Sequence, residues 1–211
     1  RTNATTLLID AGIGFPNLQH YGINSCIPDR HTIASEFHSF EALLLTHGHD
    51  DHIGAIPFIW DLLDGPIYGT RLTLALVERK LNDHGIDIDN RLIPITTKSS
   101  LKLGDLEVEF IPVVHSIPDS VAIVIRSPAG TLVHTGDFKF DRHPLAETDA
   151  AFSKFSEVGR DGVLAAYSDS TNVSERGCTG SELDLRPALE RLCKTAAARI
   201  FITTFASSLH R

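Results

Sequence analysis

Two kinds of apolar pattern alternate along the chain. Short apolar runs, rich in leucine and β-branched residues and mostly bounded by Gly, Pro or Asp, are typical of buried strands. They predict strands over residues 7–10, 42–46, 106–113, 121–125, 131–135 and 163–167. Longer stretches carry apolar residues at helical spacing and predict helices over residues 53–63, 70–84 and 181–195, the last with Ser181 as its N-cap. This alternation indicates a layered α/β domain in which helices cover sheets.

Both ends of the chain are abrupt. The first residue is Arg1 rather than methionine, and a strand-like segment follows almost at once. Near the other end, residues 199–203 predict one more strand, and a helix is expected to begin at Phe205 shortly before Arg211. We therefore expect the sequence to be part of a longer protein.

The composition is that of an ordinary globular domain. Apolar residues make up 42% of the 211 positions, enough for one sizeable core. No apolar run approaches the roughly 20 residues that span a bilayer, so we expect no membrane segment. The 3 cysteines are an odd count without a C-x-x-C pair, which argues against a disulfide framework or a thiolate zinc site and favours a reducing cytoplasm. The net charge of −8 argues weakly against a nucleic-acid partner.

The strongest chemical signal follows the apolar run at 42–45. Residues 46–52 read Thr-His-Gly-His-Asp-Asp-His, and so dense a set of histidines is difficult to explain as packing. Imidazoles two positions apart on a turning backbone can share one ion, so we expect His47 and His49 to do so. Asp51 and His52 begin the next predicted helix and are expected to point toward a second ion. Zinc accepts imidazole nitrogen and carboxylate oxygen, and catalytic sites keep a position open for water.

Three further residues stand just past predicted strands, where α/β sheets usually place their sites. His115 and Asp137 would each be ordinary alone, as a half-buried histidine and a turn residue. Beside the histidine cluster, both become candidate ligands. Asp10 follows the run at 7–9 and is expected to orient a ligand histidine from behind rather than to bind metal itself.

Taken together, these motifs resemble those of the metallo-β-lactamase superfamily. The matching stretches are Leu-Ile-Asp-Ala-Gly at 8–12, the H-x-H-x-D-H pattern at 47–52, His115, and Gly-Asp at 136–137. The resemblance implies an α/β fold, the αββα sandwich, with one or two metal ions. The superfamily's flavodiiron oxidoreductases usually carry glutamate where this chain has His49, and nitrogen ligation favours zinc hydrolysis over iron redox chemistry.

A narrower resemblance, to the ribonuclease J family of the β-CASP nuclease branch, covers nearly the whole chain. It rests on residues 46–57, 115–120, 134–141, 168–172, 179–182 and 204–211. It implies that residues 1–198 are the N-terminal portion of a metallo-β-lactamase domain. Residues 199–211 would then start a β-CASP domain that is truncated here.

The ribonuclease J resemblance also implies a ligand set for two zinc ions. One ion would be held by His47, His49, His115 and Asp137. The other would be held by Asp51, His52 and the bridging Asp137. The family's last histidine ligand lies after the β-CASP insertion, beyond residue 211.

Other roles follow from the same resemblance, with alternatives. Asp51 and Asp137 would be catalytic as metal-site carboxylates that accept a proton, and Asp169 would either assist proton transfer or only fix a hydrogen bond. Two further pairs of residues have both a functional and an ordinary interpretation. Ser170 and Thr171 would contact phosphate or serve as turn residues, and Lys139 and Asp141 would touch RNA or form an exposed turn.

The function implied by the resemblance is zinc-dependent hydrolysis of RNA phosphodiesters. It would be a cytoplasmic 5′-to-3′ exonuclease with some endonuclease activity, assembled as a homodimer or homotetramer. A small-molecule hydrolase of the lactonase or thioesterase kind is the alternative, which the acidic net charge slightly favours. A non-catalytic scaffold ranks far behind, because such a relative should have lost metal ligands.

Overall fold

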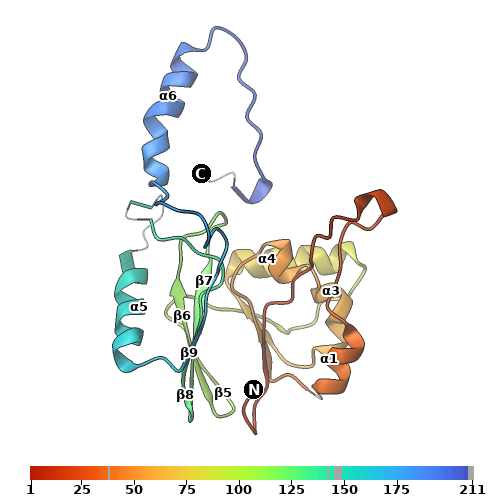
Figure 1. The fold of residues 1–211 in the computed structure, drawn as a ribbon. Helices are drawn as coiled ribbons and strands as arrows, with labels where there is room; N and C mark the ends of the chain where they lie inside the picture. The colour runs from red at the N-terminus through yellow and green to blue at the C-terminus, as the bar shows by residue number, and fades with distance from the viewer. Residues whose placement is uncertain (38, 142, 145–148, 209–211) are drawn as a thin grey trace.

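Two β-sheets and the helices outside them form the computed structural model, which describes residues 1–37, 39–141, 143–144 and 149–208 (Figure 1). The first sheet has the strand order β1-β2-β3-β4, and all its neighbouring strands are parallel. Its strands are β1 (Leu7–Ile9), β2 (Ala42–Leu44), β3 (Ile67–Gly69) and β4 (Leu92–Pro94).

The second sheet has the order β5-β6-β7-β8-β9. Its strands are β5 (Ser100–Leu103), β6 (Leu106–Pro112), β7 (Val121–Ser127), β8 (Gly130–His134) and β9 (Ala165–Tyr167). Neighbours are antiparallel except for β8 and β9, which run parallel. The parallel pair needs a crossover, and helix α5 (Asp149–Asp161) provides it.

Alternating side chains of the strands divide the core into three layers. In β2, Ala42 and Leu44 pack with Val108 and Ile123 of the second sheet, so this layer lies between the sheets. Leu43 faces the other way, into a layer shared with the helices outside the first sheet. A third layer lies between the second sheet and α5. The order helix, sheet, sheet, helix confirms the predicted αββα sandwich.

Helices of unequal length cover the outer faces. Those beside the first sheet are α1 (Arg30–Glu36), α2 (Asp50–Ile53), α3 (Ile56–Ile59) and α4 (Arg71–Asp83). Short 3-10 turns are η1 (Gln19–Tyr21), η2 (Trp60–Leu62), η3 (Glu182–Leu185) and η4 (Ala206–Ser208), and α6 (Arg186–Thr195) follows η3 directly. Figure 1 shows α6 projecting away from the sandwich before the chain returns to η4. Within the described ranges, no helix is long and apolar enough to cross a membrane.

The single helix predicted over residues 53–63 is wrong. The structure breaks it into α2, α3 and η2. The amide of Ala55 donates to the carbonyl of Ala11, so it cannot continue the helical hydrogen bonds of α2. Pro57 stands in the first turn of α3, where its missing N–H does no harm. A tertiary contact with the segment after β1 therefore overrides the apolar period.

The strand predicted over residues 199–203 is also not formed. Ile200, Phe201 and Ile202 have strand-like composition, but a strand needs a neighbour, and these side chains are 50%, 86% and 80% exposed. The helix expected from Phe205 is reduced to the 3-10 turn η4, and residues 209–211 lie outside the described ranges. The predicted helix at 181–195 begins as η3, with Ser181 as its N-cap as expected.

Candidate metal centre

Four loops that each follow a strand carry the predicted metal ligands and Asp10. Asp10 comes after β1 and the histidine motif after β2, which is parallel to β1 and hydrogen-bonded to it. His115 comes after β6, and Asp137 comes after β8. The amide of Val121 donates to the carbonyl of Thr46 and joins the two sheets at this end of the sandwich. Residues far apart in sequence can therefore converge there.

Three imidazoles meet at the first part of the site. Nδ1 of His49 lies 3.0 Å from Nε2 of His47 and 3.1 Å from Nε2 of His115. Nitrogen ligands of a tetrahedral zinc ion, each about 2.0–2.1 Å from the metal, would stand about 3.3 Å apart. The three nitrogens thus have nearly the spacing that a single ion imposes, and zinc fits this donor set.

A second possible ligand group shares a residue with the first. It consists of His47, His52 and Asp137. Oδ1 of Asp137 lies 3.3 Å from Nε2 of His52, and its Oδ2 lies 3.6 Å from Nε2 of His115. One carboxylate thus reaches toward histidines of both groups, the arrangement that a bridging ligand requires.

Asp51 is not brought into either group. Its Oδ2 lies 3.9 Å from Nε2 of His52, and its side chain is 53% exposed. The backbone around it is nevertheless tightly fixed, because Gly12 packs so closely that a Cβ there would overlap the carbonyl of Asp51. The ligand role of Asp51 stays a prediction.

Asp10 connects the histidine motif to β1. Its Oδ1 accepts from the amide of Thr46 at 2.8 Å, and its Oδ2 lies 2.7 Å from Nδ1 of His52. This partner directs Nε2 of His52 toward Asp137. Asp10 has a φ of +56°, a left-handed conformation that aspartate tolerates better than most residues. Asp10 is therefore placed to orient the candidate ligand His52.

Thr46 is a site residue whose role the sequence did not reveal. Its hydroxyl donates to Oδ2 of Asp10 at 2.7 Å and lies 3.0 Å from Nδ1 of His47. Since the hydroxyl hydrogen is used on Asp10, Nδ1–H of His47 donates to the hydroxyl oxygen. Nε2 of His47 then carries no hydrogen, and its lone pair faces the other imidazoles. The position of this threonine directly before the first histidine of the motif could have indicated its role.

The protonation states differ between the buried His47 and the partly buried His52. Burial, followed by the neighbouring imidazoles, lowers the pKa of His47 to about 2, so this ring is neutral and ready to ligate. Burial also lowers the pKa of His52, but hydrogen bonds with the carboxylates of Asp10 and Asp137 raise it to about 10. The same hydrogen bond between His52 and Asp137 acts in the opposite direction on the carboxylate: it lowers the pKa of Asp137 to about 2. A metal ion at this position would replace the proton on Nε2 of His52, because a ligand imidazole must be neutral there.

A Thr46→Val substitution is expected to weaken zinc binding about tenfold, because His47 loses the partner that fixes its tautomer. A Thr46→Ser variant keeps the hydroxyl and should bind zinc as the unsubstituted protein does. Competition against a fluorescent zinc chelator would measure both affinities. Equal affinities for the valine and serine variants would contradict the role given to the hydroxyl.

Asp169 lies behind the loop that carries Asp137. Its Oδ2 accepts from the amide of Phe138 at 3.5 Å, and its Oδ1 accepts from the amide of Thr171 at 2.8 Å. These contacts suit the hydrogen-bond role considered for Asp169. Ser170 and Thr171 are exposed beside it, and their contact with phosphate stays a prediction.

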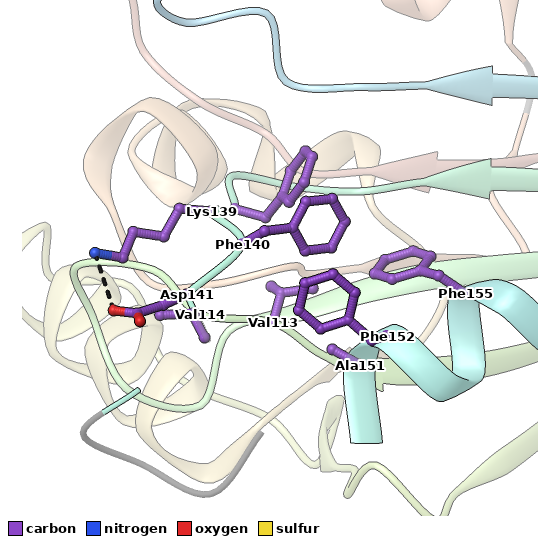
Figure 2. A pocket seen from close by; sticks show the side chains of 9 residues that line it. Val113, Val114, Lys139, Phe140, Asp141, Ala151, Phe152 and Phe155 are labelled. Atoms are coloured by element: carbon purple, nitrogen blue, oxygen red, sulfur yellow. Dashed lines mark ion pairs between the residues drawn. The ribbon is translucent and has the colours of Figure 1, made fainter. Parts of the chain in front are cut away.

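An aromatic pocket lies between the outer face of the second sheet and α5 (Figure 2). Its volume is about 250 Å³ including open solvent, and Phe140 and Phe152 stack in it with ring centroids 4.5 Å apart. The predicted metal ligands are not among the residues that line it. The chemistry of this protein is therefore assigned to the histidine cluster and not to this pocket.

Residues 5–169 match the family described as the beta-lactamase superfamily domain. With the αββα sandwich and the histidine-rich loops at its edge, this match establishes the class: the chain belongs to the beta-lactamase superfamily. Two solved structures share the fold. A protein of unknown function from Enterococcus faecalis V583 aligns with a TM-score of 0.54 at 23% identity, over 72% of this chain and 38% of that one. A metallo-β-lactamase with a HARLDQ motif from Cronobacter sakazakii gives a TM-score of 0.51 at 14% identity, over 92% and 75%.

Curated proteins similar to this chain include ribonucleases J. The chain is 36% identical to ribonuclease J of Helicobacter pylori (strain ATCC 700392 / 26695), over 100% of this chain and 31% of that protein. It is 38% identical to ribonuclease J of Thermus thermophilus, over 97% and 37%. It is 40% identical to ribonuclease J of Synechocystis sp. PCC 6803, over 97% and 32%. The chain thus spans about a third of the length of these relatives and matches their N-terminal part.

Proposed function

We propose that this chain is the metal-binding part of a zinc-dependent ribonuclease that hydrolyses RNA phosphodiesters. The observation that carries the proposal is the convergence of His47, His49, His115, His52 and Asp137 at one edge of the sandwich. The likeness to ribonucleases J over essentially the whole chain supports RNA as the substrate. We further propose 5′-to-3′ exonuclease action with some endonuclease activity.

The donor set divides naturally between two ions. His47, His49 and His115 would hold one, and His52 and Asp137 would hold the other, with Asp51 turning toward it. Zinc bound there would lower the pKa of water and neutralise charge on the phosphoryl oxygens. The chain's own carboxylates do the remaining work: Asp137 orients both histidine groups, and the exposed carboxylate of Asp51 can accept a proton.

Residues beyond the cluster complete the proposal. Asp169 holds the loop of Asp137 by its hydrogen bond to Phe138, and Ser170 and Thr171 would contact phosphate. We assign residues 1–198 to the metallo-β-lactamase domain and residues 199–211 to the start of a β-CASP domain. The exposed apolar residues Ile200, Phe201 and Ile202 support this division, because they have the composition of a strand but pair with no sheet in the described structure. A cytoplasmic homodimer or homotetramer is part of the same proposal.

A small-molecule hydrolase is the competing function. The net charge of −8 favours it, because a phosphate-binding surface is usually basic. The match to ribonucleases J over 97–100% of the chain outweighs this argument.

Metal content and RNA cleavage, measured together, test the proposal. The protein should contain nearly two zinc ions and cleave a 5′-monophosphate RNA, and a His49→Ala variant should lose both properties. A His31→Ala variant is the matched control, since His31 is exposed on α1. One zinc without cleavage would support the ligand assignment for one ion but contradict RNA cleavage by this chain. Absence of metal from the unsubstituted protein would overturn the ligand assignment.

A further inference from the structure

The loop that supplies Asp137 is also tied to the segment before α6. Asp141 has a fully buried side chain, which excludes the exposed turn considered for it. Its Oδ1 accepts from the amide of His143 at 2.9 Å, and its Oδ2 accepts from the amide of Glu182 at 3.0 Å. The Oγ of Ser181 donates to the carbonyl of His143 at 2.8 Å. These bonds join residues about forty positions apart in the sequence.

Lys139 completes this connection. Its Nζ lies 3.4 Å from Oδ2 of Asp141 and 3.0 Å from Oε1 of Glu182 (Figure 2 shows the first pair). The ammonium group is thus shared between two acids that would otherwise repel each other. Both hydrogen bonds to Asp141 stabilise its charged form, and together with Lys139 they lower its pKa despite its burial. We call Lys139, Asp141, Ser181 and Glu182 the clasp.

Lys139 of the clasp lies two residues after the candidate ligand Asp137 and is bonded to the residue before a second candidate, His115. The amide of Lys139 donates to the carbonyl of Val114 at 2.8 Å, next to His115. On its other side, the clasp fixes the start of residues 182–208, which we call the arm. The arm's far end returns to the site: Ser208 donates to the carbonyl of Ser116 at 3.4 Å, and Oγ of Ser116 lies 3.4 Å from Nε2 of His49. The arm is therefore held at its start by the loop that carries Asp137 and at its far end by Ser116, a neighbour of His49.

We propose that Asp141, with Lys139 as its counter-ion, is a positioning residue that holds the arm in register with the metal centre. The proposal rests on the proposed ribonuclease function, because only a long substrate would need both the metal centre and the arm. A short phosphodiester contacts the metal centre alone. Asp141 is distinct from the ligands and touches none of the reacting atoms.

The test compares two substrates in the full chain. Asp141→Asn leaves a single acceptor oxygen for two backbone N–H groups and removes the charge. We expect its kcat on 5′-monophosphate RNA to fall about tenfold or more, since small misplacements are costly. Hydrolysis of bis(p-nitrophenyl) phosphate and zinc content should stay within about twofold of the unsubstituted protein. Lys139→Met should give the same pattern if Asp141→Asn folds poorly, and Lys139→Arg should restore RNA cleavage.

Glu190→Gln is the matched control, because it breaks an exposed ion pair with Arg186 on the same helix. Amide hydrogen exchange of residues 179–186 supplies a readout without substrate and should become at least about tenfold faster in Asp141→Asn. Equal losses on both substrates, loss of zinc, or unchanged RNA cleavage would each overturn the positioning role. If the unsubstituted protein hydrolyses the small diester but no RNA, the ribonuclease proposal fails. Amide hydrogen exchange of Asp141→Asn then tests the clasp by itself: faster exchange supports the clasp, and unchanged exchange overturns it.

Discussion

Asp137→Asn is expected to reduce phosphodiester hydrolysis by at least about a thousandfold, with loss of one of the two zinc ions. The carboxylate uses both oxygens, one toward His52 at 3.3 Å and the other toward His115 at 3.6 Å. An amide of the same shape keeps one oxygen and replaces the other with an NH₂ group, which has no lone pair for a metal. Zinc content by mass spectrometry and single-turnover cleavage of RNA would measure the two effects.

The fold should tolerate this change, because asparagine fills the same volume. Asp87→Asn makes the same chemical change at an exposed loop position and should leave zinc content and rate unaltered. A variant with two zinc ions and more than about a tenth of the original rate would show that Asp137 is not a bridging ligand. Loss of metal together with loss of the folded state would instead make Asp137 a structural residue.

Several strands could be predicted because their burial leaves a mark on the sequence. Strand β2 is buried on both faces, and its continuous apolar run ends directly at the histidine motif. By contrast, β3 and β4 were missed: β3 reads Ile-Tyr-Gly, which is not an apolar run, and β4 is largely exposed. Strand β5, with a single buried residue, was missed because it is also largely exposed. Helix α5 was also missed, although Ala151, Phe155 and Val158 recur at helical spacing.

The candidate site was predictable as a set of residues but not as a geometry. His47, His49, His115, His52 and Asp137 could be named because their side chains have few other uses in such a dense pattern. Which ring nitrogen of each histidine faces the metal position could not be predicted, because this depends on partners such as Thr46 and Ser116. The exposed position of Asp51, 3.9 Å from His52, could not be predicted either, and neither could the bond between Ala55 and Ala11 that ends α2. Such long-range backbone contacts leave no local pattern.

Asp10→Ala is expected to lower zinc affinity and hydrolysis about 10- to 100-fold and to destabilise the fold by about 2–4 kcal/mol. The carboxylate is only 11% exposed and serves the amide and hydroxyl of Thr46 as well as Nδ1 of His52. Its removal leaves these groups buried without their acceptor, and alanine is strained at a φ of +56°. Urea denaturation and zinc titration would measure the two losses.

Asp10→Asn separates the charge from the backbone conformation, since asparagine adopts the left-handed region readily. We also expect the stability of the zinc-free protein to depend on pH, and the two variants test this. The pKa of His52 is raised from 6.5 to about 10, so its contribution to stability is complete below pH 6.5 and is lost as the pH rises through about 10. Asp10 supplies part of that shift, so the loss of stability at alkaline pH should be smaller in both variants. An unchanged pH profile would mean that Asp10 does not hold the proton of His52, and its role in orienting this histidine would have to be abandoned.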